Sequence, residues 1–295
     1  MIMNMSAGAN IQPVVGKLLS TLNVGDTLEV PVVSDWQSRF GTHIVWKVAD
    51  KNHTGYPTDS VTLITDKIIQ IMASDAEEPN NSDSNRAKYG NNRHIYSNLL
   101  QWLNSNAAAG NWYSAKHSAD APPTSANVWA GYNEYDVCAG FLAMLDSKFV
   151  SELLDTTLAV VKSSTDGGSY ETFTAKMFLA SITEVGLGTE NGIAEGAPLA
   201  LFVDGASRVA YPTAECVSNT EYTNGNFTTS KGWRWWIRTP NSLNTNNVFY
   251  VYSDGTSELY YAYRGDIGVR PLCNLPGSLR VSESPNAAGN YTLLD

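Results

Sequence analysis

Charged residues are scarce in this sequence of 295 residues. Asp, Glu, Lys and Arg together make up 16% of the chain, against about 25% in typical soluble domains. The balance is acidic, with a net charge of −10, whereas a protein that binds nucleic acid through its phosphates needs a basic face. Because Lys and Arg are also scattered along the chain, we expect no nucleic-acid partner.

Long apolar runs are also missing. No run approaches the about 18 residues of a membrane helix, so the sequence predicts no insertion into a membrane. The N-terminal sequence lacks the basic start, apolar run and cleavage site of a secretory signal. A protein made in the bacterial cytoplasm without such a signal can still be released by lysis, as bacteriophage structural proteins are.

Residue patterns that carry catalysis are few. The three cysteines, Cys138, Cys216 and Cys273, are odd in number and widely spaced, which predicts buried free thiols and no disulfide framework or paired-cysteine zinc site. The four histidines form no HExxH motif, and no GxSxG motif occurs. We therefore expect a protein that is not an enzyme and that has no metal or other cofactor. Calcium is the one exception left open, because the segment 73–93 is rich in Asp and Asn, although it contains no EF-hand loop.

Polar and aromatic residues are concentrated instead between residues 241 and 266. Eighteen of these 26 residues are Asn, Ser, Tyr, Thr, Gly or Asp, and five are Tyr. Tyr gives a large contact area at low entropy cost, and Ser, Asn and Gly give adaptable hydrogen bonds, as in antibody binding loops. The composition predicts a displayed binding face. Its candidate ligand-binding residues are Asn241, Asn244, Asn246, Asn247, Tyr250, Tyr252, Ser253, Ser257, Tyr260, Tyr261, Tyr263 and Arg264.

This segment carries a strong signal for a β-hairpin. An Asp-Gly turn at 254–255 separates two strand-like runs. Alternation along the first run puts Phe249 and Val251 on one side and Tyr250 and Tyr252 on the other. If the first pair faces the core, both tyrosines point to solvent. The alternative is a half-buried sheet face, since Tyr is a good strand former.

Two unlike segments, 233–240 and 268–275, flank the polar stretch. We expect Arg238 and Arg270 to hydrogen-bond loop carbonyls or to pair with an acid, and most of the tryptophans to anchor the loops. The Arg-Gly-Asp tripeptide at 264–266 is interpreted as a turn and not as an integrin-binding motif. The predicted scaffold residues are Trp233, Trp235, Trp236, Arg238, Pro240, Gly268, Arg270 and Pro271.

The whole chain predicts an α+β domain of short strands, a few helices and long loops. Strands are expected at 27–33, 44–48, 61–72, 158–162 and 269–275, helices at 96–104 and 136–154, and loops at 73–93, 105–135 and 184–230. This pattern favours an N-terminal arm at 1–24, a main domain at 25–280 and a peripheral tail at 281–295.

The flanking motifs carry a family resemblance. They read Trp-Trp-Ile-Arg-Thr-Pro at 235–240, Val-Tyr-Ser-Asp-Gly at 251–255 and Gly-Val-Arg-Pro at 268–271, and they resemble a domain of unknown function of gut bacteria and phages. Earlier matches lie at 44–46, 63–66, 97–104 and 178–184, so that the resemblance spans about residues 25–275. That family is similar to C-type-lectin-like folds, which include formylglycine-generating-enzyme relatives and the variable receptor-binding proteins of diversity-generating retroelements.

The resemblance implies a compact C-type-lectin-like scaffold of short, twisted antiparallel strands that displays residues 241–266. We therefore expect a non-enzymatic phage virion protein that binds a bacterial surface protein or glycan, or decorates the particle. It would contact other virion proteins, as a homo-oligomer. Two alternatives stay open. One is a purely structural head or tail protein whose Tyr-rich strands form a subunit interface, and the other is a formylglycine-generating-type enzyme or a degenerate relative.

Overall fold

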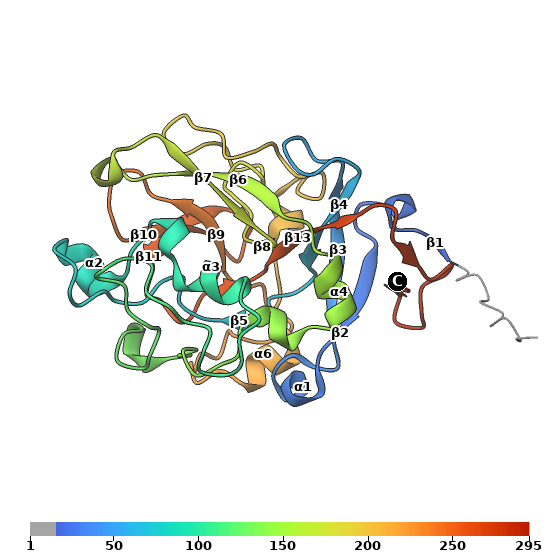
Figure 1. Cartoon of the computed structure of the whole chain (residues 1–295), viewed down its shortest axis with the longest axis horizontal. Coiled ribbons are helices and arrows are strands. Elements are labelled where there is room, and N and C mark those ends of the chain that lie inside the picture. The colour runs from blue at the N-terminus through green and yellow to red at the C-terminus, as the bar shows by residue number, and fades with distance from the viewer. Residues whose placement is uncertain (1–15, 295) are drawn as a thin grey trace, which may run out of the picture.

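The computed structural model describes residues 16–294 and contains two large sheets (Figure 1). The six-stranded sheet consists, in spatial order, of β15 (Asn290–Thr292), β2 (Thr27–Pro31), β3 (His43–Lys51), β4 (Ser60–Thr65), β13 (Leu272–Pro276) and β8 (Met177–Phe178). The five-stranded sheet consists of β11 (Ser257–Tyr261), β10 (Asn247–Val251), β9 (Trp235–Pro240), β12 (Gly268–Val269) and β5 (Gln70–Ile71). Most neighbouring strands are antiparallel, but β15 runs parallel to β2 and β12 runs parallel to β9.

Smaller elements surround these sheets. Two-stranded sheets are formed by β1 (Lys17–Leu18) with β14 (Arg280–Val281) and by β6 (Thr156–Val161) with β7 (Tyr170–Ala175). The α-helices are α1 (Gln37–Phe40), α2 (Ser84–Tyr89), α3 (Asn98–Leu103), α4 (Ser147–Glu152), α5 (Gly205–Arg208) and α6 (Ala214–Ser218). The mixture of helix and sheet confirms the α+β prediction. None of the helices within residues 16–294 combines the length and the apolar character that a membrane crossing requires.

Two segments of the chain run through both large sheets. Residues 61–72 were expected to form one strand, but they form β4 in one sheet and β5 in the other, and residues 269–275 are divided in the same way into β12 and β13. Arg270 lies at the bend and donates hydrogen bonds to the carbonyls of Thr65 (3.0 and 3.1 Å) and Asp66 (3.2 Å). The single-strand predictions are wrong because polar residues and a proline interrupt both runs, Asp66 and Lys67 in the first and Arg270 and Pro271 in the second.

The core lies on both faces of the five-stranded sheet. Trp236 and Tyr250 belong to one buried cluster, whereas their strand neighbours Trp235 and Val251 belong to a second. Successive residues of a strand point to opposite faces, so burial of both tryptophans means that β9 is covered on each side. The sheet therefore reaches solvent mainly at its edge strand, β11, whose residues are exposed or half-buried.

Local signals predicted some helices better than others. In α3, Leu99, Trp102 and Leu103 are fully buried, as their spacing indicated. The continuous helix expected at 136–154 is wrong, because the chain forms a 3-10 turn, becomes extended at Leu145 and begins again as α4 after Asp146. The Asp146 carboxylate accepts two backbone N–H groups of α4, so that it caps a shorter helix than predicted.

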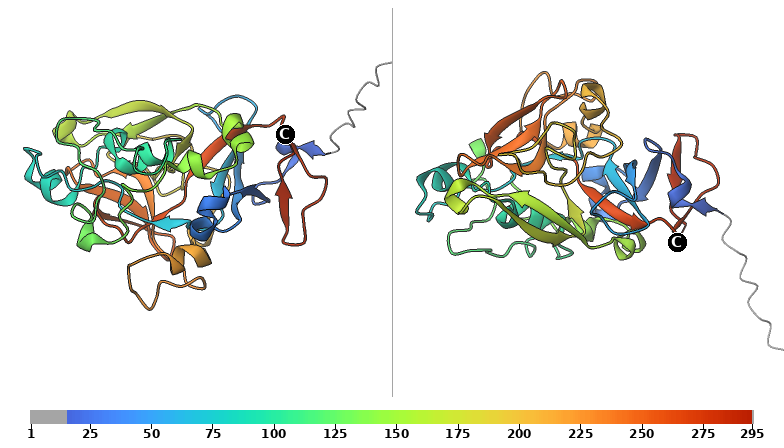
Figure 2. Two further views of the ribbon diagram at one scale, coloured as in Figure 1. Left: turned by 60° about the horizontal axis from the view of Figure 1, so that its bottom comes forward. Right: turned by 90° about the horizontal axis from the view of Figure 1, so that it is seen from above.

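The described parts of the two ends of the chain lie side by side (Figures 1 and 2). Strand β1 pairs with β14, and β15 adds to the edge of the six-stranded sheet beside β2. Leu19 and Leu22 are fully buried in the core, although they fall in the segment predicted as an arm. Residues 1–15 of that predicted arm lie outside the described residues.

Candidate functional site

The predicted hairpin is present and forms the edge of the five-stranded sheet. Strands β10 and β11 pair from Asn247–Tyr261 to Val251–Ser257. At the turn, Gly255 has a φ of +86°, and a Cβ atom there would lie 2.0 Å from the carbonyl oxygen of Gly205. The turn thus packs closely against the start of α5, which fixes the hairpin to the body of the protein.

The expectation that Tyr250 points to solvent is wrong. Its exposed fraction is 2%, its ring packs against Trp236, and its hydroxyl donates to the Glu258 carboxylate (2.6 Å). Burial, together with this hydrogen bond, raises the pKa of Tyr250. The reason is that both faces of β10 are covered, since the neighbouring Val251 is also buried. Alternation alone could not indicate which side would be open.

Other tyrosines of the hairpin do reach the surface. Tyr252 and Tyr261 are 37% and 36% exposed, while Tyr260 and Tyr263 are half-buried. Tyr89 of α2 joins them, because its ring stacks on that of Tyr261 with centroids 4.2 Å apart and planes 14° from parallel. We call these five residues, Tyr89, Tyr252, Tyr260, Tyr261 and Tyr263, the tyrosine face; Tyr252 and Tyr260 lie on one side of the hairpin and Tyr261 lies on the other.

A pair of arginines supports this face from below. The Arg264 guanidinium lies over the ring of Trp129, 3.3 Å from its centroid, and 4.4 Å from that of Tyr260. Its Nε and Nη2 atoms donate to Asp266 at 3.0 and 2.6 Å, and Arg234 pairs with the same carboxylate. Asp266 is fully buried, so the Arg-Gly-Asp tripeptide is not presented to solvent. Arg264 therefore helps to fix the position of the Tyr260 ring in the tyrosine face.

The asparagines of the segment mainly shape the loop that leads into β10. The side-chain amide of Asn92 donates to the carbonyls of Asn241 (3.1 Å), Asn244 (2.9 Å) and Asn247 (3.1 Å). The Asn244 side chain accepts the backbone N–H groups of Asn246 (3.3 Å) and Asn247 (2.9 Å). Asn241 and Asn246 are buried. These contacts account for the asparagine-rich sequence without a ligand.

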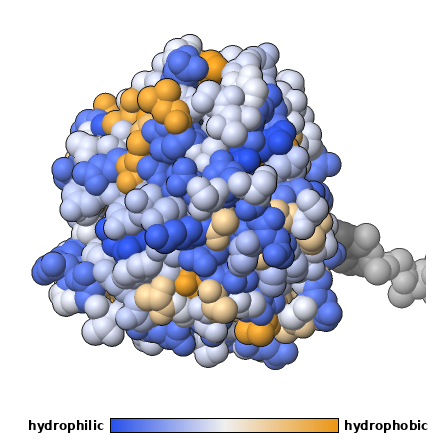
Figure 3. Space-filling view, turned by 90° about the vertical axis from the view of Figure 1, so that its left-hand side faces the viewer, coloured by the Kyte–Doolittle hydropathy of each residue, from blue (hydrophilic) through white to orange (hydrophobic). Residues whose placement is uncertain are grey.

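A polar hollow of about 430 Å³ lies beside the hairpin. Tyr252 and Ser253 belong to its wall, whereas Ser257 is half-buried on β11 and is not among the lining residues. The wall is made of Tyr222, Asn224, Asn226, Lys231, Gly232, Trp233, Arg234, Tyr252 and Ser253. It carries two cationic side chains and no carboxylate. The surface on the side of α2 is mostly hydrophilic with small apolar patches (Figure 3). Such a surface fits a polar partner better than an apolar one.

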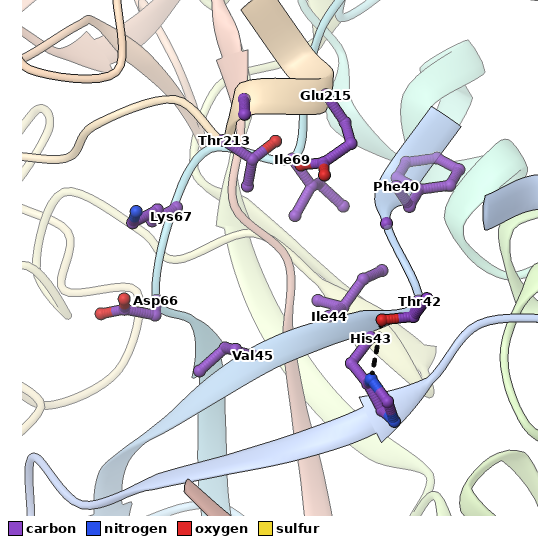
Figure 4. A pocket seen from close by; sticks show the side chains of 12 residues that line it. Phe40, Thr42, His43, Ile44, Val45, Asp66, Lys67, Ile69, Thr213 and Glu215 are labelled. Atoms are coloured by element: carbon purple, nitrogen blue, oxygen red, sulfur yellow. Dashed lines mark hydrogen bonds between the residues drawn. The ribbon is translucent and has the colours of Figure 1, made fainter. Parts of the chain in front are cut away.

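A second hollow, of about 330 Å³, opens between the start of β3 and the start of α6 (Figure 4). Glu215 reaches from α6 toward the apolar side chains of Phe40 and Ile69. The ring Nδ1 of the exposed His43 lies 3.1 Å from the Thr42 hydroxyl. None of the candidate ligand-binding residues lines this hollow.

The scaffold arginine Arg238 is buried at the centre of a charged cluster. It makes a bidentate ion pair with Glu184 (2.6 and 2.7 Å) and donates to the carbonyls of Leu179 (2.8 Å) and Glu195 (2.6 Å). Tyr56 donates to the same Glu184 carboxylate (2.7 Å). These are contacts of the kind expected for Arg238, and they tie β9 to the segment 179–195.

Sequence reasoning did not assign the two acids of this cluster to Arg238. Glu184 stood in the earlier family-like motif at 178–184, and that motif was the available signal. Glu195 lies in a loop outside any recognised motif, so no sequence signal indicated its role in this cluster. Burial raises the pKa of Glu195 to about 7, because the loss of hydration outweighs the charge of Arg238 and the hydrogen bond from Thr239, both of which lower it.

The remaining scaffold residues lie where β9, β12 and β13 meet the rest of the sheet. Trp233, Trp235 and Trp236 are buried, and each donates its ring N–H to a backbone carbonyl, that of Asp266, Arg208 and Met72 respectively. Pro240, Gly268 and Pro271 are also buried. A Cβ atom at Gly268 would lie 2.7 Å from the Ile68 side chain, so this position needs glycine for close packing.

Comparison with known proteins gives one match. The model of the family described as "Domain of unknown function (DUF6273)" matches residues 59–277, which lie within the main domain predicted at 25–280. No curated protein and no solved structure matches the chain.

Proposed function

The chain belongs to the DUF6273 family, a domain of unknown function, and we propose that it is a non-enzymatic recognition protein that binds its partner through the tyrosine face. One observation carries the proposal. Five tyrosine side chains from two segments of the chain lie along the hairpin at the sheet edge, on both of its sides, and stay partly open to solvent. Tyr rings provide contact area and hydrogen bonds at little loss of side-chain entropy.

Rigid support of these rings favours binding over a loose surface patch. The main chain of Tyr263 donates to Tyr89 O (3.0 Å) and accepts from Trp129 N (2.9 Å). Beneath it, Arg264, Arg234 and Asp266 form a buried charged network. A site whose side chains are already held in place loses less entropy when it binds. The hydrogen-bonding character of the face suits a bacterial surface protein or glycan.

Two finer points of the proposal rest on the resemblance of the flanking motifs. The first is a C-type-lectin-like fold, with which the short strands and long loops are compatible, and an experimental structure compared with lectin-like domains tests it. The second is a place on a phage particle, as a homo-oligomer beside other virion proteins and with a face diversified by a retroelement. Mass spectrometry of purified particles and inspection of the neighbouring genes test these points.

The thiols argue against the formylglycine-generating alternative. Cys138, Cys216 and Cys273 are all buried, and burial raises the pKa of each thiol. The reactive form of cysteine is the thiolate, which these surroundings disfavour. The second alternative, a structural protein with a tyrosine-lined subunit interface, uses the same face and is separated from recognition by experiment.

The test is adsorption of the purified protein to host cells. Tyr252→Ala combined with Tyr261→Ala removes the two most exposed rings of the face, and we expect adsorption to fall at least ~10-fold, since aromatic anchors contribute ≥1–2 kcal/mol each at interfaces. Tyr170→Ala, on the exposed strand β7, is the matched control. Unchanged adsorption of the double variant would refute the proposal. Loss of oligomer assembly with intact adsorption would favour the structural alternative.

A further inference from the structure

A second group of side chains lies in the loops next to the tyrosine face. Ligand atoms of Glu78, His117 and Asp120 all lie within 4.8 Å of one another. The His117 Nε2 atom lies 2.7 Å from Glu78 Oε1. The His117 Nε2 atom is inaccessible to water and has no partner in hydrogen-bonding geometry. From this convergence we propose that Glu78, His117 and Asp120 bind a divalent transition-metal ion.

The charge of the group calls for a cation. Glu78 and its neighbour Asp75 are each only 1% exposed. Within residues 16–294, neither Lys nor Arg forms an ion pair with Asp75, Glu78 or Asp120. The ion pair in this group joins Glu78 to His117. Burial, followed by the negative charges of Glu78 and Asp120, raises the pKa of Asp75. Unpaired buried carboxylates are costly, and a divalent ion would relieve that cost.

The surrounding amides already orient the carboxylates. Asn98 donates from its main chain to Asp75 (3.0 Å) and from its side chain to Asp120 (3.3 Å). Asn91 donates in the same two ways, to Asp75 (2.9 Å) and to Glu78 (3.2 Å). Outer hydrogen bonds of this kind fix the ligands of metal sites and tune their affinity. Asn81 also donates its side-chain amide to Glu78, and the backbone N–H of Lys116 donates to Asp120 (2.6 Å), so each carboxylate keeps only part of its about four lone-pair sites for coordination.

The donor set selects the class of ion. Calcium takes six to eight oxygen ligands, whereas an imidazole nitrogen with two carboxylates suits Zn²⁺, and Mn²⁺ accepts the same carboxylate-rich set. The competing interpretation is a direct contact in which the N–H at His117 Nε2 donates to Glu78. The two atoms lie 2.7 Å apart, but His117 Nε2 has no partner in hydrogen-bonding geometry, which favours a shared ion over a direct hydrogen bond.

Such an ion would restrict the motion of the tyrosine face. The metal site itself does not depend on the proposed function. Asp75 N donates to Ala262 O (3.1 Å), between Tyr261 and Tyr263. The segment after Glu78 leads directly into α2, which carries Tyr89. Holding Glu78 to the loop at 117–120 would therefore reduce the freedom of the segment that supplies one ring of the face.

The experiment titrates the full-length chain, stripped with a chelator, with ZnCl₂, MnCl₂ and CaCl₂ in separate runs by calorimetry. We expect one site for Zn²⁺ or Mn²⁺ and a rise in unfolding temperature of roughly 5 °C at metal concentrations ~100-fold above Kd. His117→Asn and Asp120→Asn should each weaken binding at least ~10-fold. His43→Asn, at an exposed histidine outside the group, should bind like the unmodified chain.

Three results would overturn the proposal. They are no uptake of Zn²⁺ or Mn²⁺ by the unmodified chain, uptake of Ca²⁺ alone, and transition-metal affinity that survives both substitutions. Circular dichroism checks that each variant is folded, and the titration of the unmodified chain decides the first two outcomes without any variant. Because metal uptake is measured in the absence of host cells, its failure is distinct from a failure of recognition.

Discussion

The ring of Tyr89 stacks on the ring of Tyr261, with centroids 4.2 Å apart. A backbone hydrogen bond next to the stack also joins the two segments, because the N–H of Tyr263 donates to the carbonyl of Tyr89 (3.0 Å). Tyr89 comes from the segment 73–93, which the sequence indicated only as a long polar loop. The surface that we propose for recognition is therefore built from two distant parts of the chain.

This stack predicts measurable coupling between the two tyrosines. In a double-mutant cycle of Tyr89→Ala and Tyr261→Ala, we expect the rings to stabilise each other by ~0.5–1.5 kcal/mol. Urea denaturation of the four proteins gives this coupling energy. Tyr89→Phe keeps the ring and should retain most of it, so additive effects of the two alanine substitutions would contradict the contact.

The hairpin turn predicts a strict need for glycine at one position. Gly255→Ala places a Cβ atom 2.0 Å from Gly205 O, in a backbone conformation with positive φ. We expect a loss of stability of at least ~1–2 kcal/mol, measured by chemical denaturation. Gly225→Ala is the control, because nothing lies within 4 Å of its Cβ position, and it should change stability by less than ~0.5 kcal/mol. Equal effects at both glycines would be inconsistent with the packed turn.

Removal of Arg238 should destabilise the fold, because it leaves the buried carboxylate of Glu184 without a cation. Arg238→Met leaves the Glu184 carboxylate, which is fully buried, without its cation, and we expect a destabilisation of ~3–5 kcal/mol. Adding Glu184→Gln removes the stranded charge and should recover part of that loss. Equilibrium unfolding in denaturant measures both variants. If the double variant is no more stable than Arg238→Met, the ion pair is not the source of the effect.

Glu195 predicts a dependence of stability on pH. Burial raises its pKa in the folded protein to about 7, from an ordinary value of 4.5. The folded state therefore holds the proton more tightly than the unfolded chain. This contribution is fully present below about pH 4.5 and is lost as pH rises through about 7, by up to ~3 kcal/mol.

Denaturation across this pH range tests the assignment. Glu195→Gln, which cannot ionise, should lack this part of the fall in stability between about pH 4.5 and 7. The matched control is Glu283→Gln, a substitution of the same kind at an exposed residue, and it should keep the slope of the unmodified chain. Identical slopes for Glu195→Gln and the unmodified chain would show that another group titrates.

Short-range signals determined several features of this protein. The Asp-Gly pair at 254–255 specified a hairpin, since few residues other than glycine adopt the required positive φ. The spacing of Leu99, Trp102 and Leu103 specified the buried side of α3, because it matches one face of a helix. The mixture of such signals indicated the α+β class, and the flanking motifs at 235–240 and 268–271 indicated a domain family of unknown function.

Only the tertiary structure decided which side chains would be displayed. Alternation assigned Tyr250 and Tyr252 to one side of a strand, but packing against Trp236 buried the first and left the second open. The pairing of Arg238 with Glu184 joins residues 54 positions apart, and the stack of Tyr89 on Tyr261 joins segments still further apart. Local sequence fixes the two faces of a strand, but burial depends on what the rest of the chain places against each face.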